Sequence, residues 1–106
     1  MRVRYLTVPH NMEGITEYQN GIEHSENMSV YKLPEDQFLE LTRNNVFMLI
    51  NENCGLLIDD YESEIIDEKN VLKCLNSKIV DQNLSKVFYK ALLEAKDNRT
   101  LVGLDF

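Results

Sequence analysis

Acidic side chains are concentrated in one short stretch of this sequence. Six carboxylates occur in the eleven positions between Ile58 and Glu68, with no lysine or arginine among them, and they account for most of the formal net charge of −7. Like charges this close repel one another, which is a cost for a domain that is stable by only about 5–15 kcal/mol. Binding a cation or a basic partner, or a gain in solubility, could offset that cost. The candidate partner-binding residues are therefore Asp59, Asp60, Tyr61, Glu62, Glu64, Asp67 and Glu68.

Tyr61 interrupts the acidic run. An aromatic side chain that can lose its water, surrounded by charges that steer a partner, is typical of a binding hot spot. The alternative is that Tyr61 packs inward from a strand while its neighbours face water. Both readings hold together if the segment is an exposed edge.

Metal-binding patterns are incomplete in this sequence. A calcium loop starting at Asp59 would need a glycine at its turn and a glutamate at its twelfth position, which is Asn70. His10 and His24 occur close to Glu13, Glu17, Glu23 and Glu26, and imidazole with carboxylate suits zinc or iron, but no recognised ligand spacing is present. We predict no metal and no cofactor.

Signatures of catalysis are also missing from the sequence. The four glycines are scattered, so there is no glycine-rich phosphate loop, and no serine occupies a nucleophile elbow. A pair of carboxylates could act as acid and base, but so could a pair in any acidic chain. We expect a binding protein and no enzyme, with a small metal-dependent enzyme using His10 and His24 as an alternative.

Length and composition limit the class of protein. A chain of 106 residues, 43% of them hydrophobic, fits a single domain over residues 1–106 with a real core. A pI of about 4.7 argues against binding nucleic acid or an anionic membrane. No apolar run approaches the roughly 20 residues that span a bilayer, and the first ten residues lack a signal-peptide pattern. We expect a cytoplasmic protein in which Cys54 and Cys74 are reduced structural residues.

Hydrophobic patterning in the first half predicts two strands, a helix and a hairpin. Residues 2–8 and 29–33 alternate as strands do, and residues 10–28 are expected to form a loop with a short helix around 15–19. Pro34, followed by two acids, suits the start of a helix. Two apolar runs are then predicted to form a β-hairpin, with strands at 46–50 and 56–58.

Helical spacing dominates the second half of the chain. Apolar residues recur at three- and four-residue intervals over 71–79 and, more regularly, over 84–95, and residues 101–106 read as a last strand. The element order predicts an α+β fold, with a mainly antiparallel sheet and helices packed on one face. Residues 54–70 carry a charge of −5 and residues 71–106 carry +2, so the surface should be dipolar.

Three segments of the second half also occur together in a known kind of protein. They are Val-Phe-Met-Leu-Ile-Asn-Glu (46–52), Leu-Leu-Ile-Asp-Asp-Tyr-Glu-Ser-Glu-Ile-Ile (56–66) and, after two helices, Leu-Val-Gly-Leu-Asp-Phe (101–106). This succession resembles the small acidic immunity proteins of bacterial polymorphic toxin and contact-dependent growth-inhibition systems. The resemblance implies a cytoplasmic inhibitor that binds a cognate toxin, such as a basic nuclease domain, without catalysis.

An acidic inhibitor suits such a target physically. Nucleases are commonly basic because they bind phosphates, and opposite potentials raise association rates toward about 10⁸–10⁹ M⁻¹s⁻¹ at low salt. The alternative partner is a host polymerase, nuclease or repair protein, bound by a regulatory module of phage or mobile-element type, a class that includes acidic nucleic-acid mimics. The sequence leaves these two kinds of basic protein partner open.

Overall fold

The sheet that organises the molecule is antiparallel throughout. In this computed structural model, which describes residues 3–59 and 63–106, four strands lie in the order β2-β1-β4-β3. The central strands β1 and β4 are antiparallel neighbours, and Tyr5 of β1 lies opposite Asp105 of β4. The edge strand β2 pairs with β1, and the edge strand β3 pairs with β4. The strands are β1 (Arg4–Pro9), β2 (Met28–Leu33), β3 (Ser63–Ile66) and β4 (Val102–Asp105).

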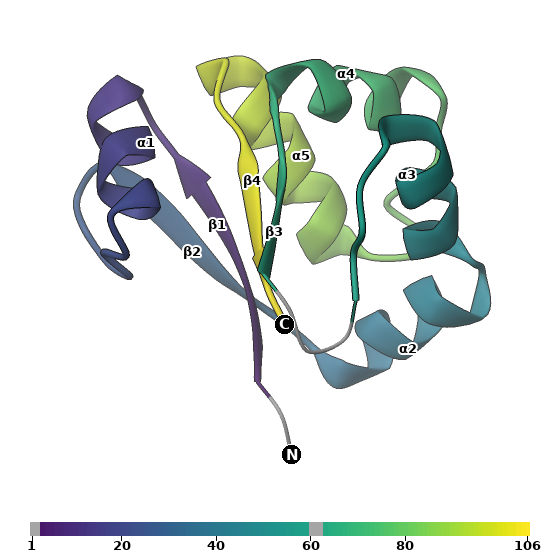
Figure 1. The fold of residues 1–106 in the computed structure, drawn as a ribbon. Helices are drawn as coiled ribbons and strands as arrows, with labels where there is room; N and C mark the ends of the chain where they lie inside the picture. The colour runs from purple at the N-terminus through teal and green to yellow at the C-terminus, as the bar shows by residue number, and fades with distance from the viewer. Residues whose placement is uncertain (1–2, 60–62) are drawn as a thin grey trace.

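Helices cover the two faces of this sheet unequally. The described ranges contain the helices α1 (Met12–Gln19), α2 (Glu35–Arg43), α3 (Val46–Cys54), α4 (Glu68–Asn76) and α5 (Lys86–Asn98). Figure 1 shows α2 to α5 on one side of the sheet and α1 alone on the other. The predicted α+β class, with an antiparallel sheet and packed helices, is confirmed. Within these ranges no helix combines the length and the apolar character needed to cross a membrane.

The core lies between the sheet and α2 to α5. Leu6 and Val8 of β1 and Leu104 of β4 are fully buried against the helices, while Tyr5 and Thr7 alternate onto the opposite face. Burying an aliphatic or aromatic side chain of this size stabilises a fold by about 1.5–3 kcal/mol. The predicted helix over 84–95 is confirmed as α5, because its buried residues recur at helical spacing: Phe88, Ala91, Leu92 and Ala95.

The predicted hairpin is wrong. Residues 46–50 form the first half of α3, with Val46 and Ile50 buried one helical turn apart, and residues 56–58 are not a strand. Asn45 and Gly55, both in the left-handed region with φ of 58° and 67°, bound α3 at its two ends. Burial on one side of a helix has therefore prevailed over the strand propensity of valine, phenylalanine and isoleucine.

Two free thiols lie next to each other where α3 meets α4. Cys54 is half-buried and Cys74 is fully buried. Burial, and next the neighbouring Cys54 thiol, raise the pKa of Cys74 to about 12. Cys74 is therefore protonated at neutral pH and packs as a small apolar side chain.

Candidate functional site

The structure describes four of the seven predicted partner-binding residues. Asp60, Tyr61 and Glu62 lie outside the described residues. Asp59 is exposed, in the segment between α3 and β3, and Glu64 is half-buried within β3. The Glu64 carboxylate accepts hydrogen bonds from the backbone N–H groups of Leu57 (3.2 Å) and Ile65 (3.0 Å). Glu64 therefore ties the segment after α3 to the sheet.

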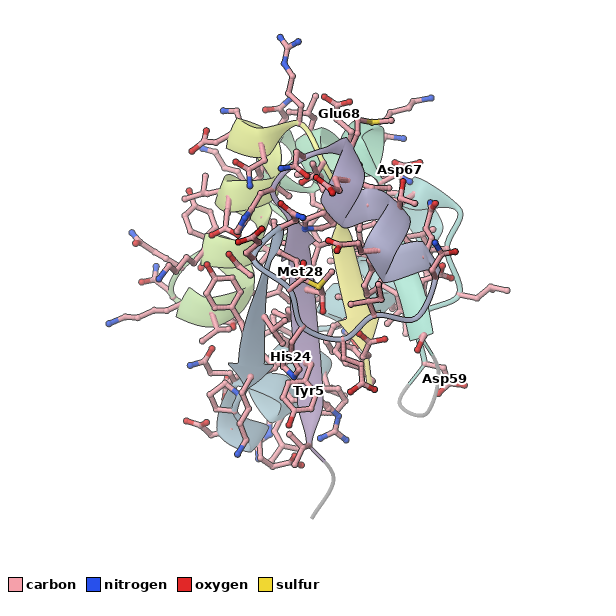
Figure 2. All side chains as sticks on the ribbon, turned by 90° about the vertical axis from the view of Figure 1, so that its left-hand side faces the viewer. Tyr5, His24, Met28, Asp59, Asp67 and Glu68 are labelled. Atoms are coloured by element: carbon pink, nitrogen blue, oxygen red, sulfur yellow. The ribbon has the colours of Figure 1, made fainter. Side chains whose placement is uncertain are left out.

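Asp67 and Glu68 stabilise the beginning of α4. The Asp67 carboxylate accepts from the Asn70 N–H at 2.9 Å, and Glu68 lies in the first turn, where negative charge favours the helix. Figure 2 shows these two residues at one end of the molecule and Asp59 at the other. The described residues of the acidic run are thus spread along an edge of the fold, and the role of the run in binding a partner stays a prediction.

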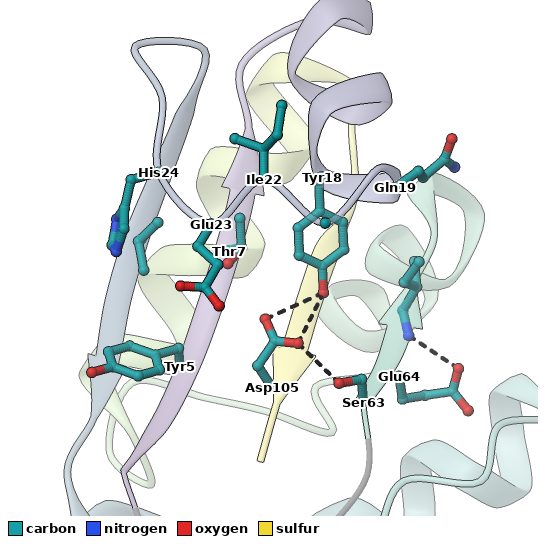
Figure 3. A pocket seen from close by; sticks show the side chains of 13 residues that line it. Tyr5, Thr7, Tyr18, Gln19, Ile22, Glu23, His24, Ser63, Glu64 and Asp105 are labelled. Atoms are coloured by element: carbon teal, nitrogen blue, oxygen red, sulfur yellow. Dashed lines mark hydrogen bonds between the residues drawn. The ribbon is translucent and has the colours of Figure 1, made fainter.

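A cavity opens on the face of the sheet that α2 to α5 leave uncovered (Figure 3). Its volume is about 660 Å³. Strands of the sheet form its floor, and α1 with the loop that follows it forms a wall. The lining residues are Tyr5, Thr7, Tyr18, Gln19, Gly21, Ile22, Glu23, His24, Val30, Ser63, Glu64, Ile65 and Asp105.

Strand alternation and register bring the floor residues together. Tyr5 of β1 and Ser63 of β3 both pair with Asp105 of β4, so the three side chains share one face of the sheet. The Ser63 hydroxyl donates to Asp105 Oδ1 at 3.0 Å. This bond fixes Ser63 beside the Asp105 carboxylate, although the two residues are 42 positions apart in the sequence.

Tyr18 closes the wall of the cavity from α1. Its hydroxyl lies 3.4 Å from both carboxylate oxygens of Asp105. The ring reaches that position by lying over Gly103, where a Cβ atom would be 2.1 Å from the Tyr18 hydroxyl oxygen. A larger residue at this point of β4 would therefore have to displace the Tyr18 ring from the sheet.

The loop after α1 is held in place by Glu17. Its carboxylate accepts from the Ser25 hydroxyl at 2.8 Å and from the Asn27 side-chain amide at 3.1 Å. This loop carries Glu23 and His24 to the cavity. Residues 20–27 have no regular helix or strand, yet these bonds give them a defined path.

Bases are scarce on the side of the sheet that carries α1 and the cavity. No lysine or arginine occurs between Arg4 and Lys32 or between Arg43 and Lys69, whereas seven of the eleven bases lie between positions 69 and 99, the region of α4 and α5. Arg4 is buried and pairs with Glu35 at 2.6 Å. Among the described residues that line the cavity, Glu23, Glu64 and Asp105 are acidic and none is a lysine or arginine. On the cavity's face of the sheet Lys32, which pairs with Tyr5, is a described base, whereas the helices on the other face carry both acids and bases. The dipolar surface expected from residues 54–70 and 71–106 stays a prediction.

The two histidines have different surroundings. The His10 ring lies 2.8 Å from the Ser29 hydroxyl and 3.1 Å from the Glu26 carbonyl oxygen, and His24 lines the cavity. In residues 3–59 and 63–106, no group of three or more histidine, cysteine or acidic side chains is arranged to hold a metal ion.

The fold has a counterpart among solved structures. This chain is similar to the Neisseria DNA mimic protein DMP12, with a TM-score of 0.56, 21% sequence identity, and 100% of each chain covered. A likeness of this size shows a common fold. No protein-family model and no curated protein matches the sequence.

The sequence did not reveal the cavity because its residues come from separate segments. Tyr18 and Asp105, which meet at its wall, are 87 positions apart. One sequence signal pointed toward it: the stretch from Tyr5 to Tyr31 contains four glutamates and no base. Such a stretch has to occupy an acidic part of the surface once it folds.

Two tyrosines should make the protein less stable in alkali. Burial, and next the Asp105 carboxylate, raise the pKa of Tyr18, and burial followed by a 2.5 Å hydrogen bond to Glu94 raises the pKa of Tyr31. The unfolded chain releases these protons near pH 10, whereas the folded chain keeps them. The stability is therefore fully present below pH 10 and is lost as the pH rises further.

Urea unfolding at pH 8, 10 and 11 measures this loss. A Tyr18→Phe variant has no phenol to ionise at this position, so its free energy of unfolding should fall less between pH 10 and pH 11 than that of the unchanged protein. Identical pH dependence of the two proteins would contradict the assignment to Tyr18.

Proposed function

We propose that this protein binds a basic, nucleic-acid-binding protein and occupies the surface that would otherwise hold phosphates. The observation that carries the proposal is the excess of carboxylates over bases on the side of the sheet that carries α1 and the cavity. Glu13, Glu17, Glu23, Glu26 and Asp105 lie on that side with Lys32, and seven of the eleven bases lie between positions 69 and 99, in and beside α4 and α5. A surface of one sign attracts a partner of the opposite sign and orients it during the encounter.

The similarity to a DNA mimic protein supports this proposal. Proteins that bind DNA do so largely through lysine and arginine contacts to phosphates. A folded protein that takes the place of DNA has to offer carboxylates to those same side chains. A net charge of −7 on 106 residues, with one side nearly free of bases, meets that requirement.

A nuclease toxin is one partner of this class. The resemblance of residues 46–106 to immunity proteins supports a cognate toxin, which the protein would neutralise in the cytoplasm by direct binding and without catalysis. The acidic run at 59–68 would then extend the contact surface beyond the cavity. A host polymerase, nuclease or repair protein is the other partner of this class, and a DNA mimic would suit either one.

Capture followed by competition with DNA tests the proposal. The tagged chain is incubated with extract of its native host at low salt, and bound protein is eluted in parallel with a salt gradient and with duplex DNA. We expect one basic protein in near-equal amount, released by both. A nuclease assay on the eluted protein then separates a toxin from a housekeeping protein. A partner that salt releases and duplex DNA does not would contradict occupation of a phosphate-binding surface.

A further inference from the structure

We propose that the cavity on the open face of the sheet receives an arginine side chain. The arginine would come from the basic partner, and in that respect the inference rests on the proposed function. The chemistry of the cavity is a property of this chain and can be tested without the partner.

The cavity has the size and the walls of a ligand site. Its volume of about 660 Å³ falls within the roughly 300–1,000 Å³ typical of such sites, and it can hold an arginine with part of the flanking chain. The Tyr5 and Tyr18 rings come from opposite sides, and Val30 and Ile65 add apolar surface. Figure 3 shows the Glu23 carboxylate directed into the space between the Tyr5 ring and Asp105.

Its carboxylates keep capacity to accept further hydrogen bonds. Asp105 accepts from Ser63 at 3.0 Å and from Tyr18 at 3.4 Å, and the longer contact is weak. A carboxylate offers about four lone-pair sites, so Asp105 can also accept from a cation. Glu23 is exposed, and with Asp105 it brings two negative charges to this space. Glu64 pairs with Leu104, so its carboxylate lies on the other face of the sheet, and Lys32, which pairs with Tyr5, is a described base on the cavity's face.

Arginine matches this combination better than lysine does. Its planar guanidinium can stack on a tyrosine ring while its several N–H groups reach two carboxylates at once, and it loses water more readily than an ammonium group. Arginine is also the side chain that many DNA-binding proteins insert into the minor groove. Holding that side chain in the cavity would withdraw it from DNA.

NMR titration of the whole protein tests the inference with small probes. The ¹⁵N-labelled chain is titrated with N-acetyl-arginine amide, N-acetyl-lysine amide and N-acetyl-citrulline amide, the last having nearly the shape of arginine without its charge. We expect saturable shifts at the amides of Thr7, Glu23 and Asp105 with arginine in the millimolar range, at least threefold weaker binding of lysine, and none of citrulline. Shifts that do not saturate, or that are equal for all three probes, would overturn the inference.

A matched pair of glutamates in one loop gives the control. Glu23 lines the cavity and Glu26 does not, and both side chains are exposed. Glu23→Gln should weaken arginine binding at least fivefold, whereas Glu26→Gln should leave it within twofold. Equal effects would show that overall charge, and not the cavity, attracts arginine.

The two proposals can fail separately. Arginine binding at the cavity, without capture of any basic protein, would overturn the proposed function and keep the assignment of the cavity. Capture of a basic protein that duplex DNA reverses, without saturable arginine binding, would overturn the cavity assignment alone.

Discussion

Neutralising three exposed glutamates on the α1 side is expected to lower affinity for the basic partner about tenfold to a hundredfold at low salt, or about 1.4–2.7 kcal/mol. The variant is Glu13→Gln, Glu23→Gln and Glu26→Gln together, and it changes the net charge from −7 to −4. Charges at the rim of an interface act mainly on the encounter, so most of the loss should appear in the association rate constant. Surface plasmon resonance at 50 mM and 500 mM NaCl measures it, and the difference should shrink at high salt because the Debye length falls to about 4 Å.

The matched control removes the same charge from the other side of the sheet. This control variant combines three substitutions, Asp36→Asn, Glu52→Gln and Asp97→Asn. The residues lie on α2, α3 and α5 with exposed side chains, and their replacement again gives a net charge of −4. We expect this variant to bind within about threefold of the unchanged protein. An equal loss in both variants would mean that net charge alone governs binding, and the acidic face would then have no special part in it.

The fold class could be predicted from the sequence because burial follows simple periods in most elements. The buried residues of α5 recur at helical spacing, and Leu6 and Val8 alternate with polar or exposed neighbours in β1. In these segments residue type and burial agree, so local patterning points to the correct element. The predicted positions of β1, β2, β4 and α5 therefore lie within a few residues of the observed ones, whereas β3 was not predicted as a strand.

The region of α3 was predicted wrongly because two signals conflict there. Residues 46–50 are strand formers by type, but Val46 and Ile50 are four apart, a spacing that a buried helix face also satisfies. Short apolar runs of this kind are decided by their tertiary contacts. Asn45 and Gly55 are the residues that set the ends of the helix, through left-handed conformations that asparagine and glycine tolerate.

The cavity could not be predicted because it depends on which strands are neighbours. Asp105 shares a face with Ser63 and Tyr5 only because β4 lies between β1 and β3. Periodicity places each of these side chains on one of two faces and leaves the strand order open. The acidic run at 59–68 was conspicuous in the sequence, yet Glu64 and Asp67 serve local hydrogen bonds as well.

Gly14→Ala is expected to destabilise the protein by about 2–3 kcal/mol, although alanine in a helix normally stabilises by about 1 kcal/mol relative to glycine. A Cβ at Gly14 would lie 2.1 Å from the carbonyl oxygen of Asn27. That oxygen cannot retreat freely, since it accepts from the His10 N–H at 2.8 Å, and the Asn27 side chain is bonded to Glu17. The clash therefore has to push α1 away from the strands. Urea unfolding at neutral pH measures the change.

Thr16→Ala is the control for this prediction, because Thr16 is exposed on the same helix and alanine has the higher helix propensity. It should leave the free energy of unfolding unchanged or slightly higher. A Gly14→Ala variant as stable as the unchanged protein would show that α1 is not held against Asn27.

Since α1 carries Tyr18 and leads into the loop that carries Glu23, any Gly14→Ala protein that still folds should also lose the arginine-dependent NMR shifts. If stability falls but those shifts remain, the shape of the cavity does not depend on how closely α1 packs against Asn27.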